Sequence, residues 1–108
     1  MLIAHVHFSA PPAQHDAALA VLLDEVSTVR TLPGCHTFLP FPDPTDPGTL
    51  GVLHEWENAA ALATYLASPG FATVGKVLRP MMTALPVSKR FEAKLLETQA
   101  EPLDLSHG

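Results

Sequence analysis

Cysteine and charge are both scarce in this sequence of 108 residues. Cys35 is the one cysteine, which excludes a disulfide framework and a zinc site built from several cysteines. Charged residues make up only 16% of the chain, and the six Lys and Arg residues, against eleven acidic ones, form no basic stripe. Nucleic acid and anionic membranes are therefore not expected as partners.

Several functional sequence signals are also missing. The chain has no uninterrupted apolar run of about 18 residues, so no membrane span is expected. The first eight residues lack the basic start and the long apolar core of a signal peptide, which favours a cytoplasmic location. Neither a glycine-rich phosphate loop nor a Gly-x-Ser-x-Gly elbow occurs, which argues against nucleotide cofactors and serine hydrolysis.

What is present is a globular pattern, since 47% of the residues are hydrophobic and the length suits one domain. Helical spacing of apolar residues predicts a helix over 13–31, and capping residues Asn58 and Ser68 predict two short helices behind them. Alternating or bounded apolar runs predict the strands, which are residues 2–8, 35–41, 49–56 and 87–96.

The order of these elements, β-α-β-β-α-β, is that of a ferredoxin-like α+β fold, an antiparallel sheet with helices on one face. The predicted domain spans residues 1–96, and residues 97–108 form a polar tail. The strands are apolar on both sides, as Val52 and Leu53 illustrate. In a monomer, the face of the sheet without helices would therefore be exposed to water. We therefore expect a homodimer in which two sheets pack face to face.

Six histidines are unusual in so short a chain. Strand alternation places His5 and His7 on one face of the first strand, and His54 lies on the third strand, which neighbours the first in this fold. Whether His54 shares their face depends on strand register, which the sequence leaves open. One of the three suits proton abstraction or hydrogen bonding at a substrate, although a metal site or purely structural roles are alternatives. His15 and His36 are expected at the surface.

The run from Leu53 to Phe71, LHEWENAAALATYLASPGF, resembles the signature of the antibiotic biosynthesis monooxygenase superfamily, as does the Leu32-Pro-Gly-Cys35 element. The resemblance implies a dimeric α+β barrel with a small-molecule pocket between helices and sheet. Trp56 matches the family tryptophan, so the resemblance implies a place in the pocket wall, with core packing as the alternative. Tyr65 and Phe71 are further candidates for contact with a flat aromatic substrate.

Members of this family include oxygenases that need no cofactor, because the substrate supplies the electrons. The resemblance therefore implies a cofactor-independent monooxygenase that oxidises a quinol or an aromatic polyketide-like molecule with O₂. Haem-degrading relatives carry a histidine ligand shortly after the aromatic residue, but here Ala72, Thr73, Val74 and Gly75 follow Phe71. The alternative function is a non-catalytic small-molecule binding or stress-response module of the same fold.

Overall fold

The structure is a computed structural model that describes residues 1–100. It contains four strands, β1 (Leu2–Ser9), β2 (Cys35–Pro42), β3 (Thr49–Trp56) and β4 (Val87–Glu92). The helices are α1 (His15–Arg30), α2 (Ala59–Leu66) and α3 (Pro69–Leu78), with 3₁₀ turns η1 (Pro12–Gln14) and η2 (Arg79–Met81). Most of the predicted tail at 97–108, namely residues 101–108, lies outside the described residues.

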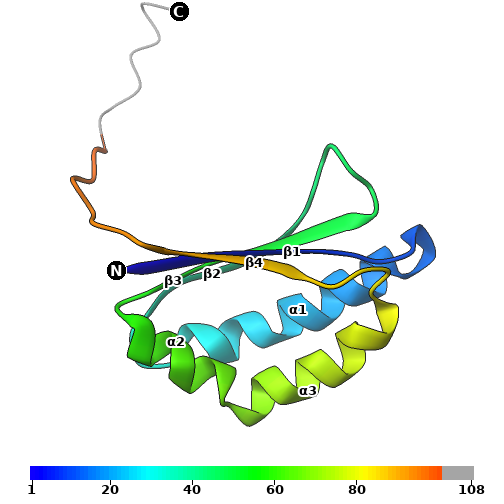
Figure 1. The fold of residues 1–108 in the computed structure, drawn as a ribbon, viewed down its shortest axis with the longest axis horizontal. Helices are drawn as coiled ribbons and strands as arrows, with labels where there is room; N and C mark the ends of the chain where they lie inside the picture. The colour runs from blue at the N-terminus through cyan, green and yellow to red at the C-terminus, as the bar shows by residue number, and fades with distance from the viewer. Residues whose placement is uncertain (101–108) are drawn as a thin grey trace, which may run out of the picture.

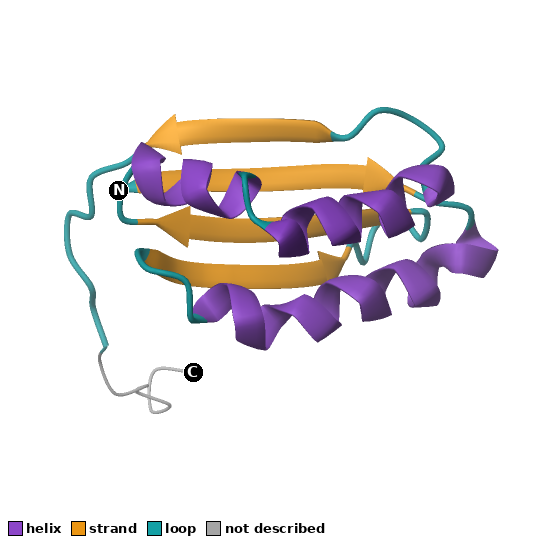
Figure 2. Ribbon diagram, turned by 90° about the horizontal axis from the view of Figure 1, so that it is seen from below, coloured by secondary structure: helices purple, strands orange, loops and turns teal. Residues whose placement is uncertain are grey.

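The four strands form one antiparallel sheet in the order β2-β3-β1-β4, and the helices cover one of its faces (Figure 1). This is the predicted ferredoxin-like α+β fold. Seen from the helical side, α1 runs along the β2 side of the sheet while α2 and α3 follow one another beside it (Figure 2). None of the helices among residues 1–100 is long and apolar enough to cross a membrane.

The helix boundaries follow from local chemistry. The Asn58 side chain accepts a hydrogen bond from the backbone N–H of Ala61, and the Ser68 hydroxyl accepts one from that of Phe71. Each bond satisfies a backbone donor that has no partner in the first helical turn. Pro69 occupies the first turn of α3, where its missing N–H costs nothing. The predicted helix over 13–31 begins two residues later, because Pro12 opens a 3₁₀ turn first.

The core lies between the helices and the face of the sheet formed by alternate residues of the strands. Its largest fully buried side chains are Trp56, Phe38 and Leu50. The pairing of Ala4 with His54 sets which residues of β1 and β3 share this face. His54 therefore points toward the helices, together with Trp56, rather than toward the other side of the sheet.

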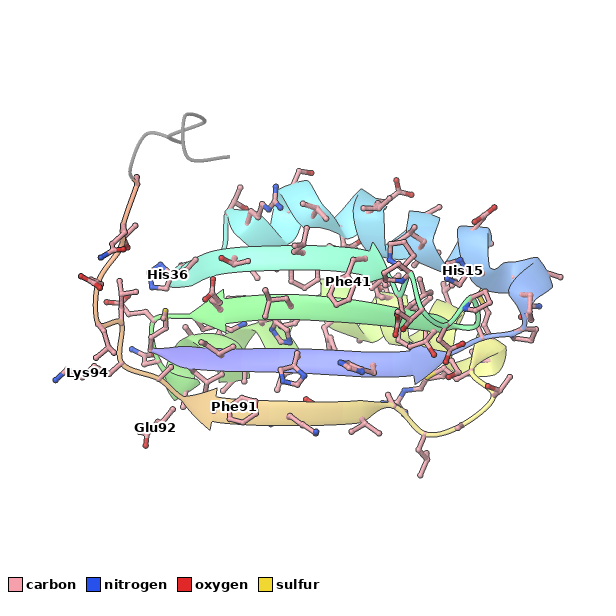
Figure 3. The ribbon with its side chains drawn as sticks, turned by 90° about the horizontal axis from the view of Figure 1, so that it is seen from above. His15, His36, Phe41, Phe91, Glu92 and Lys94 are labelled. Carbon is pink, nitrogen blue, oxygen red and sulfur yellow. The ribbon has the colours of Figure 1, made fainter. Side chains whose placement is uncertain are left out.

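The opposite face of the sheet carries no helix, and we call it the open face. Figure 3 looks onto it and shows Phe41 of β2 and Phe91 of β4 lying on it. Leu39 and Phe91 are 46% and 48% exposed there, and the Phe41 ring lies over Gly51. The open face is thus partly apolar, as the sequence predicts for a dimer interface.

Two segments differ from, or add to, the sequence-based expectation. The last strand was predicted over 87–96 but ends at Glu92, which pairs with Leu2 at the start of β1. The loop between β2 and β3, rich in proline, rises on the open-face side of the sheet (Figure 1). It is closed by hydrogen bonds from Thr45 to the Asp43 carboxylate and from Gly48 and Thr49 to that of Asp46.

Candidate functional site

A cavity of about 190 Å³ lies between the sheet and the helices. Val6, Val52 and His54 line it from the sheet. Tyr65 of α2 and Phe71 of α3 line it from the helices, together with aliphatic side chains of α1 and α3. Its walls are therefore mostly apolar, as a pocket for a flat aromatic molecule requires.

His54 is the buried polar residue of this cavity, and its side chain is held by Trp56. The indole N–H of Trp56 donates a hydrogen bond of 2.8 Å to Nδ1 of His54. Because indole can only donate, Nδ1 must accept, and the neutral imidazole carries its proton on Nε2. Nε2–H is therefore the hydrogen-bond donor that His54 can offer to a ligand in the cavity that it lines.

The electrostatics of the site keep His54 uncharged. Burial, with a smaller contribution from the positive charge of Arg90, lowers the pKa of His54 from 6.5 to about 4. At neutral pH the Nδ1 lone pair is occupied by Trp56 and Nε2 carries a hydrogen. His54 can therefore donate a hydrogen bond to a ligand oxygen, but it has no free lone pair with which to remove a proton.

Tyr65 completes an aromatic cluster around this pair. Its ring stacks on Trp56 with centroids 5.3 Å apart, and it meets the edges of Phe38 and Phe71 at 5.8 and 5.2 Å. Burial raises the pKa of Tyr65 to about 12, with smaller contributions from the negative charge of Glu25 and from Cys35. Its phenol is thus a neutral donor at the cavity wall.

The structure separates the three histidines that the sequence proposes as catalytic candidates. His5 and His7 lie on the open face, with ring centroids 5.5 Å apart, and His5 stacks on Phe91 at 5.4 Å. Only His54 lines the cavity. Of the proposed substrate-contacting residues, Tyr65 and Phe71 line it, whereas Trp56 is fully buried and reaches it through His54.

Three polar residues of the cavity were missed by the sequence analysis, namely Arg79 of η2 and Ser88 and Arg90 of β4. Strand alternation places Ser88 and Arg90 on one face of the last strand, but a polar face of this kind would ordinarily be predicted to point to solvent. The register of β4 on β1 pairs Ser88 with Val6 and so turns both residues to the helical side. All three are exposed, which puts the cavity mouth between η2 and β4.

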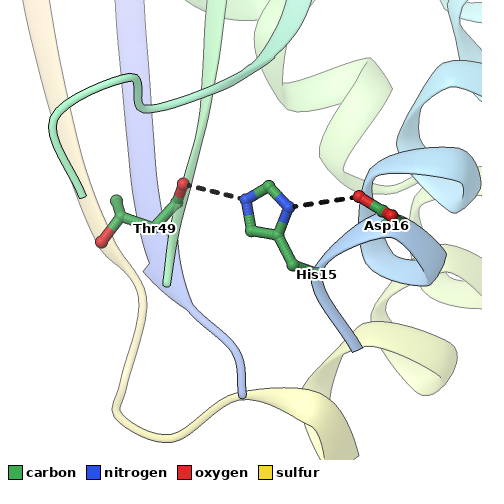
Figure 4. Close-up of polar contacts among 3 residues, drawn as sticks. All are labelled: His15, Asp16 and Thr49. Atoms are coloured by element: carbon green, nitrogen blue, oxygen red, sulfur yellow. Dashed lines mark hydrogen bonds and ion pairs between the residues drawn. The ribbon is translucent and has the colours of Figure 1, made fainter. Parts of the chain in front are cut away.

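The remaining described histidines lie away from the cavity. His36 is exposed at the start of β2, as predicted. His15 was expected at the surface but is mostly buried. Its Nε2 lies 3.4 Å from the Thr49 carbonyl oxygen, and its Nδ1 lies 3.7 Å from the Asp16 carboxylate (Figure 4). It joins the first turn of α1 to the start of β3. Within residues 1–100 no three His, Cys, Asp or Glu side chains are grouped as a metal site.

Similar folds occur among solved structures. A Deinococcus radiodurans protein named for the antibiotic biosynthesis monooxygenases aligns with 94% of this chain and 100% of its own, at 24% identity and a TM-score of 0.84. A Caulobacter crescentus CB15 protein of the same designation aligns with 87% of this chain and 90% of its own, at 23% identity and a TM-score of 0.82.

A Bacteroides thetaiotaomicron VPI-5482 protein of unknown function, described as a possible oxidoreductase, is also similar. It aligns over 85% of this chain and 96% of its own, at 16% identity and a TM-score of 0.79. At these identities the likeness concerns the fold. No curated protein matches the chain.

The family itself is identified from the sequence. The model of the antibiotic biosynthesis monooxygenase family matches residues 1–76, which hold β1 to most of α3 and therefore include both His54 and Trp56. This match spans more than half of the chain. The protein belongs to the antibiotic biosynthesis monooxygenase family.

Proposed function

We propose that this protein is a cofactor-independent monooxygenase that oxidises a quinol or an aromatic polyketide-like molecule with O₂. The observation that carries the proposal is the neutral His54 imidazole in the wall of an apolar, aromatic-walled cavity, held by Trp56 at Nδ1 so that Nε2–H is its hydrogen-bond donor. Such a donor stabilises a substrate oxygen as negative charge develops on it.

The reaction requires little of the protein. For an anthrone, the ring methylene loses two hydrogens and becomes a carbonyl; one atom of O₂ enters this carbonyl, and the other leaves as water. The substrate supplies all the electrons, so no external reductant is consumed. The protein's tasks are to hold the aromatic body between Tyr65 and Phe71, to favour the substrate anion by hydrogen bonds, and to exclude water.

The substrate proton is proposed to leave to water at the cavity mouth. The polar side chains that line the cavity are His54, Tyr65, Arg79, Ser88 and Arg90, and at neutral pH each is a hydrogen-bond donor to the substrate rather than a strong base. Of the three histidines considered from the sequence, we therefore propose His54 as the active one, acting as a hydrogen-bond partner. His5 and His7 are proposed to contribute to the subunit interface.

The same fold also supports the proposal of a homodimer. The open face presents Leu39, Phe91 and the two histidines to solvent in the single chain, and two such faces packed together would remove them from water. We propose that the protein acts in the cytoplasm, where the free thiol of Cys35 would stay reduced.

Oxygen uptake by the EDTA-treated protein with a panel of hydroquinones and anthrones tests the function. Uptake above the autoxidation rate, with no hydrogen peroxide formed, is the expected result for a monooxygenase. His54→Gln should reduce the rate about tenfold to a thousandfold, because it removes an oriented donor to the developing anion. His36→Gln, on the exposed start of β2, is the matched control and should leave the rate unchanged.

The two candidates on the open face are tested by His5→Gln and His7→Gln. These variants are compared at protein concentrations that keep the oligomeric state constant. A loss of rate in either, with His54→Gln unaffected, would contradict the assignment of His54. If no substrate gives uptake while the protein still binds aromatic ligands, the non-catalytic binding module becomes the better explanation.

A further inference from the structure

The mouth of the cavity carries positive charge. Arg79 of η2 and Arg90 of β4 both line the cavity, and no Asp or Glu is among its lining residues. The whole sequence has six Lys and Arg residues against eleven acidic ones, so two of its few cations are placed at this one cavity.

Neither guanidinium is neutralised by the described part of the chain. Within residues 1–100, the one contact of a basic group with a carboxylate is that of His15 with Asp16, at the start of α1. Arg79 and Arg90, which line the cavity, therefore have no carboxylate within ion-pair distance among residues 1–100. The charge of Arg90 also acts at the cavity floor, since it contributes to the lowered pKa of His54.

A third cation lies close by. A shallow hollow beside the cavity shares Phe71, Gly75 and Arg79 with it and is also lined by Lys76 of α3. The three basic side chains thus come from α3, η2 and β4, which border the mouth, whereas the inner walls are apolar. Guanidinium groups bind carboxylates with paired hydrogen bonds, which makes them suited to anchoring such a group at the rim.

We propose that this cavity selects aromatic carboxylates, with the ring in the apolar interior and the carboxylate between Arg79 and Arg90 at the mouth. This inference deepens the proposed function, because it names the class of substrate for the same site. Ligand binding by itself tests it, with no oxidation step required.

The experiment is isothermal titration calorimetry with 2-naphthoate and its neutral isostere 2-naphthamide at low ionic strength. The wild-type protein should bind 2-naphthoate about tenfold more tightly, and the difference should shrink in high salt because the arginines are exposed. Arg79→Gln and Arg90→Gln should each weaken binding of 2-naphthoate about three- to fivefold, the size of an exposed ion pair. Binding of 2-naphthamide should stay unchanged, which also shows that the variants are folded.

Lys94→Gln is the charge-matched control, because Lys94 lies beyond the end of β4 and outside the cavity. Equal affinity of the wild-type protein for the two ligands would overturn the inference. So would an equal loss of both ligands in the arginine variants, or a loss of 2-naphthoate binding in Lys94→Gln as large as in Arg90→Gln.

The inference and the proposed function can fail separately. Selective binding of 2-naphthoate without oxygen uptake on any quinol or anthrone would support the inference and reject the oxygenase. Oxygen uptake on neutral anthrones by a protein that does not distinguish 2-naphthoate from 2-naphthamide would reject the inference and keep the oxygenase.

Discussion

The indole of Trp56 fixes the tautomer of His54. The two side chains lie two residues apart on β3, on the same face, and their hydrogen bond of 2.8 Å is fully enclosed by the core. Trp56 thereby acts on the cavity without lining it. It is a positioning residue, and its contribution can be separated from simple core packing.

Trp56→Phe should raise the pKa of His54 modestly above about 4, with burial and the charge of Arg90 still holding it below 6.5. The substitution frees Nδ1, so protonation there no longer competes with an N–H donor. Histidine resonances followed by NMR across this pH range measure the change. Phe38→Leu is the control, because Phe38 packs against His54 at 6.0 Å without a hydrogen bond. An equal rise in the control would show that loosened packing, and not the lost donor, is the cause.

The free energy of unfolding should fall as the pH drops from 6.5 to 4. In this window an unfolded histidine takes up a proton that the folded His54 does not, so protonation favours the unfolded chain. Above pH 6.5 this effect is absent, and at pH 4 it amounts to up to roughly 3 kcal/mol. Urea denaturation of the wild type and of His54→Gln measures it, and the wild-type loss should exceed that of the variant. Parallel curves would contradict the buried, neutral state of His54.

Tyr65 should ionise only near pH 12. Burial disfavours the phenolate, and the charge of Glu25 acts in the same direction. Because Tyr65 is the only tyrosine of the sequence, absorbance at about 295 nm reports this one residue. Glu25→Gln should move the midpoint slightly downward. A midpoint near the ordinary value of 10 would place the hydroxyl in solvent and remove it from the cavity wall.

Gly34→Ala should destabilise the protein by about 1–3 kcal/mol. Gly34 has a φ of +80°, and a Cβ at this position would lie 2.8 Å from Cβ of Ala61 in α2. Gly48→Ala is the matched control, because its Cβ would meet nothing closer than 3.6 Å and its φ is not positive. Thermal or urea denaturation of both variants gives the comparison, and an equal effect of the two substitutions would contradict the proposed clash.

Leu39→Arg should convert the proposed dimer to a monomer. The new charge would lie on the open face, where the two sheets are proposed to meet, and burying it would be costly. Leu23→Arg is the control, because Leu23 is similarly exposed, at 52%, but lies on α1. Sedimentation velocity at micromolar concentration distinguishes the species. A wild-type protein that sediments as one chain would remove the dimer from the proposal.

Local patterns predicted most of the secondary structure correctly. Alternation placed His5 and His7 together, because successive side chains of a strand must point to opposite sides. The caps at Asn58 and Ser68 were also correct, since a short polar side chain satisfies a backbone N–H only a few residues away. Each of these inferences concerns atoms that are close in the sequence.

The end of β4 shows where such inference stops. Residues 93–96 continue the alternation of the strand, but β1 begins at Leu2, which already pairs with Glu92. The backbone N–H of Ala93 donates to the Met1 carbonyl, and within residues 1–100 no strand pairs with residues 94–96. A strand needs a partner for its backbone hydrogen bonds, and the partner's length is set by a distant part of the chain.

The residue types of the site were therefore set locally, whereas the site itself was assembled by the tertiary structure. The sequence determined that the chain would form this sheet and these helices, and which side chains share a face of each strand. Strand register alone decided that His54 faces the cavity while His5 and His7 face away, because one step of register exchanges the two faces. Register also placed Arg90 at the mouth of the cavity. Arg90 pairs with Ala4 and lies on β4, the edge strand that comes last in the sequence.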